Sequence, residues 1–307
     1  MPPKTSKLAA KLYSFVLDEV LNTLAKRFSF DVEEAKRLFQ KKFITITIGG
    51  VAENDLNMET MGMVRKRGYN LDELGRFREK FQEMGIQQFE WVCLNDGLIG
   101  TEYEGKGEDA VTLVVRNGIN AILNSVNGAN DMEKELDKDE IIDKKVWSRK
   151  HNRVVNKIAR WNNCFGPKAQ EPDYENKKGR IVPYDNVPLL KQVIDWFLVM
   201  EREFGEDVNA QLFAEGNYYY NEKCGIGKHG DKERRKIMGF RLGMSAPIGY
   251  RWHIHRKGVG KTMRVMLNHG DIFIMSAKAV GYDCLKRSKL TLMHAAGAEK
   301  YMKQLDK

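Results

Sequence analysis

One stretch, from Asn217 to Gly243, constrains the fold of this chain more than any other, because it places a metal-type ligand pair between two runs that read as strands. The pair is His229 and Asp231, separated by Gly230. Side chains alternate faces along an extended backbone, so residues two apart point the same way and can reach one metal ion. One more histidine from a distant part of the chain would complete the two-histidine, one-carboxylate set that holds non-haem Fe(II) with open positions. The alternative interpretation is a charged turn between two strands.

The residues around this pair resemble the AlkB-like 2-oxoglutarate/Fe(II)-dependent dioxygenases. In that family an N-x-Y segment precedes an H-x-D run, and later strands carry a leucine-glycine pair and an H-G-D followed by hydrophobic residues. The matching segments here are Asn217-Tyr218-Tyr219, His229-Gly230-Asp231-Lys232-Glu233, Leu242-Gly243 and the LNHGDIFIMS run from Leu267 to Ser276. The resemblance covers roughly residues 155–300, and it is to a divergent type that we associate with large DNA viruses and algae.

This resemblance implies a fold, a metal and a co-substrate. The fold is a double-stranded β-helix, of the jelly-roll or cupin-like kind, in the C-terminal half of the chain. The metal is Fe(II) and the co-substrate is 2-oxoglutarate, with Asn217 and Tyr219 as hydrogen-bonding contacts to it. The resemblance also leads us to expect a virus-encoded protein.

The chain has six histidines, so five besides His229 are candidates for the third ligand, and His294 is the one we predict. It follows Asp271 by 23 residues, close to the interval at which prolyl-hydroxylase-type members of the superfamily place their distal histidine. His253 and His255 lie beside two arginines in YRWHIHRKG, which predicts an exposed basic strand. His269 stands at a predicted turn. The predicted metal and catalytic set is therefore His229, Asp231 and His294.

The sequence offers no single cation for the distal carboxylate of 2-oxoglutarate. Aligned with the AlkB-type R-x-N-x-T-x-R strand, the segment from Arg287 to Met293 keeps the first arginine and the threonine but lacks the asparagine and the second arginine. In that alignment no histidine remains for the metal. With His294 as the ligand, the cation must come from elsewhere, because a buried carboxylate needs a charge partner. The candidate co-substrate cations are Arg287, Lys300 and Lys303.

Composition places the chain among intracellular globular proteins. Its 307 residues are 42% hydrophobic and 10% aromatic, which excludes a disordered chain and allows two domains. The sequence has no run of eighteen apolar residues and no secretion signal, so we expect no membrane segment and a cytoplasmic or nuclear location. The four cysteines lie far apart without a CxxC pair, which predicts reduced thiols.

Residues 1–130 are predicted to form an N-terminal module. Helical periodicity from Leu8 to Phe28, and again from Asp31, predicts a helical hairpin. Strand patterns follow in FITITIGG, FEWVCLND and AVTLVVRNG, with helices after Asn70 and in INAIL. These elements read as a small α/β module.

A reversal of charge predicts the boundary of that module. Residues 131–143 hold seven acids and two lysines, and residues 144–160 hold seven basic residues and no acid. We therefore predict a charged linker at 131–150 and the β-helix domain at 151–307, which together with the N-terminal module gives the α+β class.

Two basic segments are candidates for contact with nucleic acid. The net charge of +9 permits an anionic partner. Residues 144–160 predict either an amphipathic helix that docks on the second domain or a phosphate-binding surface. Residues 251–264 include Gly258-Val259-Gly260-Lys261-Thr262, which lacks the first glycine of a P-loop and is read as a basic hairpin turn.

Two functions of different class follow from these patterns. One is a 2-oxoglutarate/Fe(II)-dependent oxygenase that hydroxylates or demethylates a C–H position on a nucleobase or nucleic acid. The other is a dioxygenase-fold protein without catalysis that binds nucleic acid or has a structural or assembly role.

Overall fold

The computed structural model describes residues 16, 19–27, 32, 41–55 and 58–307. Residues 19–27 are helical, as predicted for the first N-terminal helix, while most of the predicted helical hairpin lies outside the described residues. From residue 43 onward the chain is strand-rich with several helices, which confirms the α+β class.

The strands of the described chain, in order, are β1 (Phe43–Gly49), β2 (Val51–Glu53), β3 (Thr60–Gly62), β4 (Phe89–Cys93), β5 (Val111–Val115), β6 (Lys145–Ser148), β7 (Arg153–Asn156), β8 (Trp161–Gly166), β9 (Ile181–Pro183), β10 (Phe213–Tyr219), β11 (Gly225–His229), β12 (Ile237–Gly243), β13 (Ala246–Ile254), β14 (Lys257–Leu267), β15 (Ile272–Met275) and β16 (Thr291–Gly297). The helices are α3 (Leu71–Glu83), α4 (Gly118–Ile122), α5 (Gly128–Leu136), α6 (Pro188–Glu203) and α7 (Glu299–Met302), with 3-10 turns η1 (Leu94–Leu98) and η2 (Tyr184–Asn186).

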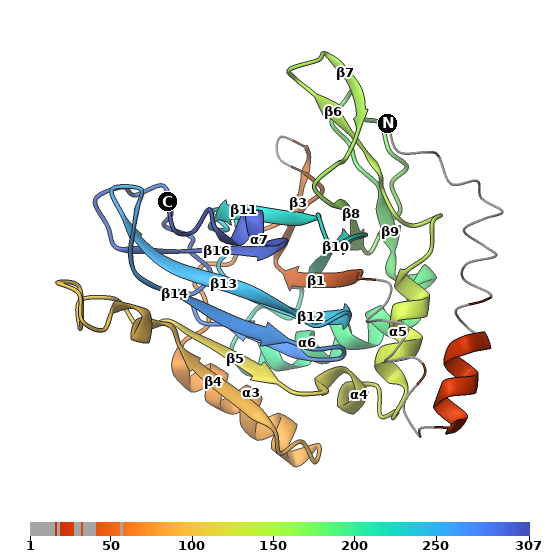
Figure 1. Ribbon diagram of the computed structural model, residues 1–307, viewed down its shortest axis with the longest axis horizontal. Coiled ribbons are helices and arrows are strands. Elements are labelled where there is room, and N and C mark those ends of the chain that lie inside the picture. The colour runs from red at the N-terminus through yellow and green to blue at the C-terminus, as the bar shows by residue number, and fades with distance from the viewer. Residues whose placement is uncertain (1–15, 17–18, 28–31, 33–40, 56–57) are drawn as a thin grey trace.

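Most strands belong to two antiparallel sheets that pack face to face. The major sheet has the order β4-β5-β15-β12-β1-β10-β8-β9, with only the β8–β9 pair parallel. The minor sheet has the order β11-β16-β13-β14. Helices α3, α4, α5 and α6 cover the other face of the major sheet (Figure 1), and their apolar residues share one core with its strands. Among the described residues the two sheets share no strand, and the finer assignment as a double-stranded β-helix stays a prediction.

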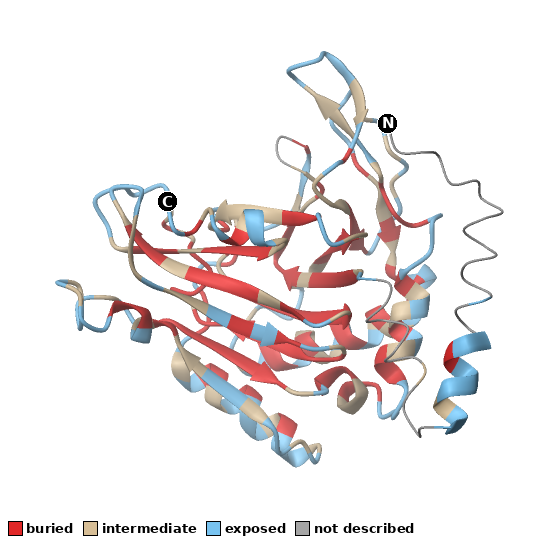
Figure 2. Cartoon of the chain, viewed as in Figure 1, coloured by how far each residue is buried: buried red, intermediate tan, exposed pale blue. Residues whose placement is uncertain are grey.

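Strand β1 shows how the sequence sorts side chains between these layers. Its FITITIG pattern alternates, so Ile44, Ile46 and Ile48 point toward the helices and join their core. Thr45 and Thr47 point to the opposite face, where they line a cavity between the sheets. Figure 2 shows that the central strands of both sheets are largely buried, whereas the edge strands β4, β11 and β14 are mostly intermediate or exposed.

The predicted division at residues 131–150 is corrected by the topology of the major sheet. Strand β1 lies between β10 and β12, and β5 pairs with β15. One sheet therefore contains strands from both 1–130 and 151–307. The reason is that β1 has backbone groups to pair on both edges, and its hydrogen-bonding neighbours are supplied by the C-terminal half. Residues 131–150 contribute to α5 and β6 and do not form a linker.

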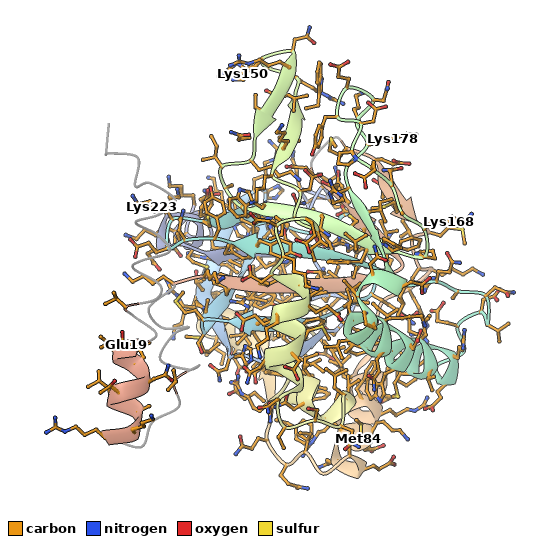
Figure 3. The ribbon with its side chains drawn as sticks, turned by 90° about the vertical axis from the view of Figure 1, so that its right-hand side faces the viewer. Glu19, Met84, Lys150, Lys168, Lys178 and Lys223 are labelled. Carbon is orange, nitrogen blue, oxygen red and sulfur yellow. The ribbon has the colours of Figure 1, made fainter. Side chains whose placement is uncertain are left out.

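The basic segment 144–160 contains a β-hairpin, so the predicted amphipathic helix is wrong. Strands β6 and β7 pair Val146 with Val155 and Trp147 with Val154, and Asn152 in the connecting turn has a φ of 45°. The hairpin projects from the body of the protein, with Lys150 near its tip (Figure 3). β-branched valines at paired positions favour strands over a helix.

The second basic segment is also placed differently from the prediction. Gly258 to Thr262 lies inside β14, and the turn that joins β13 to β14 is His255-Arg256, with φ values of 51° and 67°. All four cysteines are free thiols, as predicted. Within the described part of the chain, no helix combines the length and the apolar run needed to cross a membrane.

Candidate metal centre

The structure brings His229, Asp231 and His294 together at one end of the minor sheet. His229 ends β11 and lies directly opposite His294 on β16, and Asp231 follows in the next loop. The Asp231 oxygens lie 3.8 Å from His229 Nε2 and 3.5 Å from His294 Nε2. One possible ligand atom from each residue lies within 4.8 Å of the others. The predicted convergence is present, and the role of these residues as ligands stays a prediction.

Hydrogen bonding orients the His229 ring for a ligand role. Its Nδ1 lies 2.7 Å from the carbonyl oxygen of Gly227, a geometry in which Nδ1–H donates and Nε2 carries the free lone pair. Metal-binding histidines commonly donate their second ring nitrogen to a carbonyl in this way. The strand itself therefore fixes the tautomer that presents Nε2 to the carboxylate of Asp231.

The charge states suit a divalent cation. Burial, together with the neighbouring His294 ring, lowers the pKa of His229 to about 4, so its imidazole is neutral at neutral pH. Burial alone would raise the pKa of the Asp231 carboxyl, but His294, Arg234 and His229 outweigh it and hold that pKa well below its ordinary value. A metal ion needs both deprotonated forms. The His229 side chain is 30% exposed against 10% for Asp231 and 8% for His294, so the cluster opens on the His229 side.

The cluster faces a cavity of about 640 Å³ between the two sheets. Thr45, Thr47, Asn217 and Tyr219 line it from the major sheet, and the three candidate ligands line it from the opposite side. The predicted co-substrate contacts Asn217 and Tyr219 therefore share a cavity with the candidate metal ligands. The Asn217 amide is already engaged, since its Oδ1 accepts from Arg160 and its Nδ2 donates to Glu215 at 3.0 Å.

Sequence reasoning missed Arg241, which is the most unusual side chain near this cavity. It is fully buried and does not itself line the cavity. It lies directly opposite Thr45, which does line it, and its guanidinium carbon lies 4.1 Å from the centre of the Phe43 ring. None of its three guanidinium nitrogens has a hydrogen-bond partner among the described residues, and the buried Thr45 hydroxyl also has none. Burial lowers the pKa of Arg241 to about 10, so it remains charged at neutral pH.

The carboxylate that attracts Arg241 most directly, that of Asp271, is already committed to other donors. It accepts hydrogen bonds from Arg116 and from the backbone N–H groups of Asn117 and Asn268. The sequence did hold a signal for Arg241, because it is the lone charged residue in the apolar strand IMGFRLG. Its lack of a partner, however, could only be seen in the fold.

The other predicted cations lie away from the buried end of the cavity. Arg287 lines the mouth and is exposed. Lys300 and Lys303 are exposed on and beside α7 and do not line the cavity, so their predicted co-substrate role is corrected. The reason is that α7 packs Met302 against Ala295 and directs its lysines to solvent.

The predictions for the remaining histidines were partly correct. His253 is 1% exposed, which contradicts the exposed strand that we predicted, and its Nδ1 lies 3.0 Å from the Arg251 carbonyl oxygen. His255 lies in the β13–β14 turn. His269 lies in a loop, as predicted, and its Nδ1 accepts from the Gly243 N–H at 2.9 Å.

Comparison with known proteins relates the chain to a viral protein. No protein-family model matches the chain. The chain is 40% identical over 267 residues to a protein of Acanthamoeba polyphaga mimivirus named "Uncharacterized protein R156". The alignment covers 86% of this chain and 98% of the viral protein.

Proposed function

This chain belongs to the same family as the mimivirus protein R156, and we propose that it is a 2-oxoglutarate/Fe(II)-dependent oxygenase built on a double-stranded β-helix. The observation that carries the proposal is the convergence of His229, Asp231 and His294 on an inter-sheet cavity. Two imidazoles and one carboxylate are the ligand set of non-haem Fe(II) oxygenases, in which the remaining positions take substrate and oxygen.

Arg241 supports a dicarboxylate as the co-substrate. Arg241 stacks on Phe43 but its guanidinium has no hydrogen-bond partner among the described residues. A buried cation without hydrogen bonds to an acceptor is costly, so the site is suited to an anion that enters with its own negative charge. A guanidinium binds a carboxylate through two parallel hydrogen bonds, and the Thr45 hydroxyl beside it offers a third. Arg241 and Thr45 thus fit the distal carboxylate of 2-oxoglutarate, in place of the cations that we expected from the sequence.

The residues around the cavity have two roles in this proposal: some hold the ion and the co-substrate, and others limit the access of water. When bound, Fe(II) would activate O2, with 2-oxoglutarate as the co-reductant that leaves as succinate and CO2, and the second oxygen atom of O2 would be transferred to a C–H bond of the substrate. His229, Asp231 and His294 would hold the ion, and Arg241, beside the cavity-lining Thr45, would orient the co-substrate from the major sheet. Apolar side chains from both sheets close the inner wall of the cavity and limit the access of water: Ile237, Ile248, Phe273 and Met275.

The cavity mouth supports a phosphate-bearing substrate, and we propose nucleic acid. Five cations line it without an ion pair to a described carboxylate: Lys228, Lys232, Arg256, Arg287 and Lys289. They come from separate segments of the chain, and cations grouped in this way attract phosphates. The carboxylates of Glu53, Asp55 and Glu233 also line the cavity and would limit which parts of an anionic chain can enter.

The first prediction tests the reaction. Purified protein supplied with Fe(II) and O2 should convert 2-oxoglutarate to succinate and CO2, and Asp231→Ala should abolish that conversion because only two ligands remain for the ion. Folding should change little, because Arg234 keeps its stronger contact with Glu215 when the Asp231 carboxylate is removed. Succinate formation and thermal unfolding are the two measurements.

Lys303→Ala is the matched control, since this exposed lysine was a sequence candidate that the structure places outside the cavity. It should keep full turnover. Protein that retains iron but forms no succinate, with or without oligonucleotide, would overturn the oxygenase proposal.

A further inference from the structure

Asp231 is followed by a tight turn that places the charged side chain of Arg234 close to the Asp231 carboxylate. The Arg234 N–H donates to the Asp231 carbonyl at 3.0 Å, and the Arg234 guanidinium lies 3.9 Å from Asp231 Oδ1. Asp231 lies beyond the end of β11, so strand pairing does not fix its backbone, and the nearest groups to its carboxylate besides Arg234 are the two candidate ligand histidines. Arg234 is therefore a group that can restrict how this carboxylate is oriented.

Arg234 is itself fixed by two neighbouring strands. Its Nη2 donates to Glu215 Oε2 at 2.5 Å and its Nε donates to the Val51 carbonyl at 3.1 Å. The side chains of Arg234 and Glu215 are 6% and 8% exposed. A buried ion pair with additional hydrogen bonds has little freedom to rearrange, because separating it leaves two uncompensated charges.

The same pair also reaches the amide of Asn217. Glu215 Oε1 accepts from Asn217 Nδ2 at 3.0 Å, and Arg160 donates to Asn217 Oδ1. A continuous polar chain thus runs from Asp231 through Arg234 and Glu215 to Asn217. It connects the candidate metal ligand with the residue that faces the co-substrate cavity.

We propose that the Arg234–Glu215 pair is a positioning element that holds Asp231 in its ligating orientation and couples it to the Asn217 side of the cavity. This inference rests on the proposed function. Arg234 alone would repel a divalent cation, and Glu215 cancels that charge, so the pair orients the carboxylate without a net electrostatic cost to metal binding. Groups that orient metal ligands in this way typically change metal affinity by about 10–100-fold when they are removed.

The test is a charge-balanced double variant, Glu215→Gln/Arg234→Gln, which removes the pair without changing the net charge near the site. Binding is measured by titration of the metal-free protein with Co(II), followed by its absorption spectrum. We expect the Kd for Co(II) to rise by about 10–100-fold. The spectrum of the bound ion should also change, because the Asp231 carboxylate is no longer held in one orientation.

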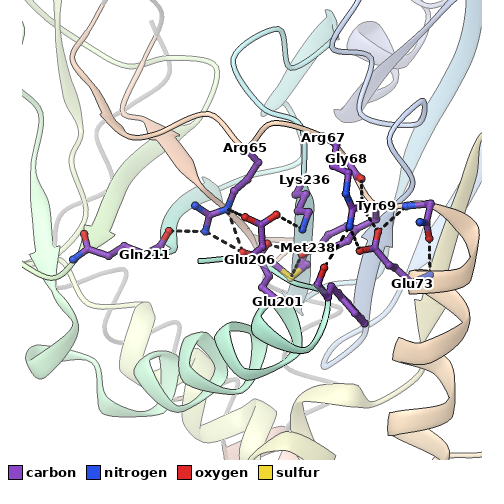
Figure 4. Close-up of polar contacts among 12 residues, drawn as sticks. Arg65, Arg67, Gly68, Tyr69, Glu73, Glu201, Glu206, Gln211, Lys236 and Met238 are labelled. Carbon is purple, nitrogen blue, oxygen red and sulfur yellow. Dashed lines mark hydrogen bonds and ion pairs between the residues drawn. The ribbon is translucent and has the colours of Figure 1, made fainter. Parts of the chain in front are cut away.

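The matched control is the double variant Arg65→Gln/Glu201→Gln, on the helix-covered side of the major sheet (Figure 4). This pair is as buried and has the same kinds of partner, since Arg65 also donates to the Gln211 carbonyl and Glu201 also accepts from the Tyr69 hydroxyl. Both double variants should lose stability, and only the site pair should lose affinity for Co(II). Equal and unchanged affinities would overturn the proposal.

Two further outcomes are separable. If the site double variant does not fold, Glu215→Gln alone leaves Arg234 uncompensated beside the ion, and Co(II) affinity must then fall by repulsion for the proposal to stand. If the wild-type protein binds Co(II) and the variants behave as expected but no succinate forms, the positioning role holds while the oxygenase function fails. Wild-type protein that binds no Co(II) would overturn both the positioning role and the oxygenase function.

Discussion

Arg241 is the single side chain on which the proposed binding of the co-substrate depends most. Proteins bury arginine with carboxylates or carbonyls around it, as they do for Arg65 and Arg234 in this molecule. Arg241 has the same depth and none of those partners among the described residues. A charged group in such a position destabilises the folded protein unless a ligand supplies the opposite charge. The burial of the Arg241 side chain is thus better explained by the binding of an anionic ligand than by a contribution to folding stability.

This explanation predicts opposite effects on stability and on binding. Arg241→Met, a substitution of similar length, should raise the free energy of unfolding of the ligand-free protein by about 1–4 kcal/mol, because an unpaired buried charge is replaced by an apolar side chain. The same variant should lose saturation by 2-oxoglutarate while its affinity for metal is kept. Denaturant unfolding and 2-oxoglutarate titration measure the two effects.

Arg65→Met is the contrasting variant, since it breaks a buried ion pair and should lower the free energy of unfolding by about 3–5 kcal/mol. If Arg241→Met were destabilising to the same degree, its guanidinium would be making a structural contact, and the anion-binding role would be withdrawn.

Some of these residues could be predicted from the sequence and others could not, for a physical reason. His229 and Asp231 were predicted from their spacing together with the matching segments around them, because the spacing by itself also fits a charged turn. The choice of His294 needed the resemblance to a family. Arg234 and Arg241 were not predictable, since their importance depends on which strands of the major sheet lie beside them and on which acceptors those strands already use.

At the scale of elements, the β6–β7 hairpin is the part of the molecule whose shape departs most from its sequence pattern. The spacing of Trp147, Val154 and Val155 among charged residues fits one face of a helix as well as two paired strands. In the structure these residues pair across two strands, so the segment is a hairpin and not a helix, and its cations are exposed to solvent. By contrast, helix α3 was predicted correctly, because Asn70 and Glu73 form a capping box at its start.

The hairpin leads to a prediction about nucleic acid. Replacing Arg149, Lys150 and Arg153 with serine should weaken binding to a single-stranded oligonucleotide. The slope of log K against log salt concentration should become shallower by about 0.7 for each phosphate that the protein no longer neutralises. All three side chains are exposed and lie outside the cavity, so 2-oxoglutarate turnover without nucleic acid should not change.

A control with equal charge change is the triple serine variant of Lys300, Lys303 and Lys307, which are exposed near the C-terminal helix. Oligonucleotide affinity as a function of salt is measured for both. An equal loss of affinity in the two variants would indicate general charge attraction and would exclude the hairpin as a specific contact.

At the scale of the whole molecule, the chain builds one sheet from both of its halves. The pattern of elements before residue 130 suggested a complete module because helices and strands alternate there. Local patterns predict which segments are strands, but they carry no information about which strand becomes the neighbour of another. That choice is made by long-range pairing, such as Thr45 with Asn217 and Arg241, and it places residues from both halves around one cavity.

The last prediction follows from this arrangement. A fragment of residues 151–307 contains all three candidate ligands but lacks β1, so both β10 and β12 would expose backbone groups along the edges that β1 normally pairs. The fragment should show no cooperative thermal unfolding and no Co(II) binding, and it should recover both when residues 1–150 are co-expressed with it as a separate chain. Recovery would show that the site lacks the elements supplied by residues 1–150, which include β1 and the β5 partner of β15. A fragment that unfolds cooperatively and binds Co(II) by itself would restore the two-domain division, because the C-terminal sheet would then be complete without β1.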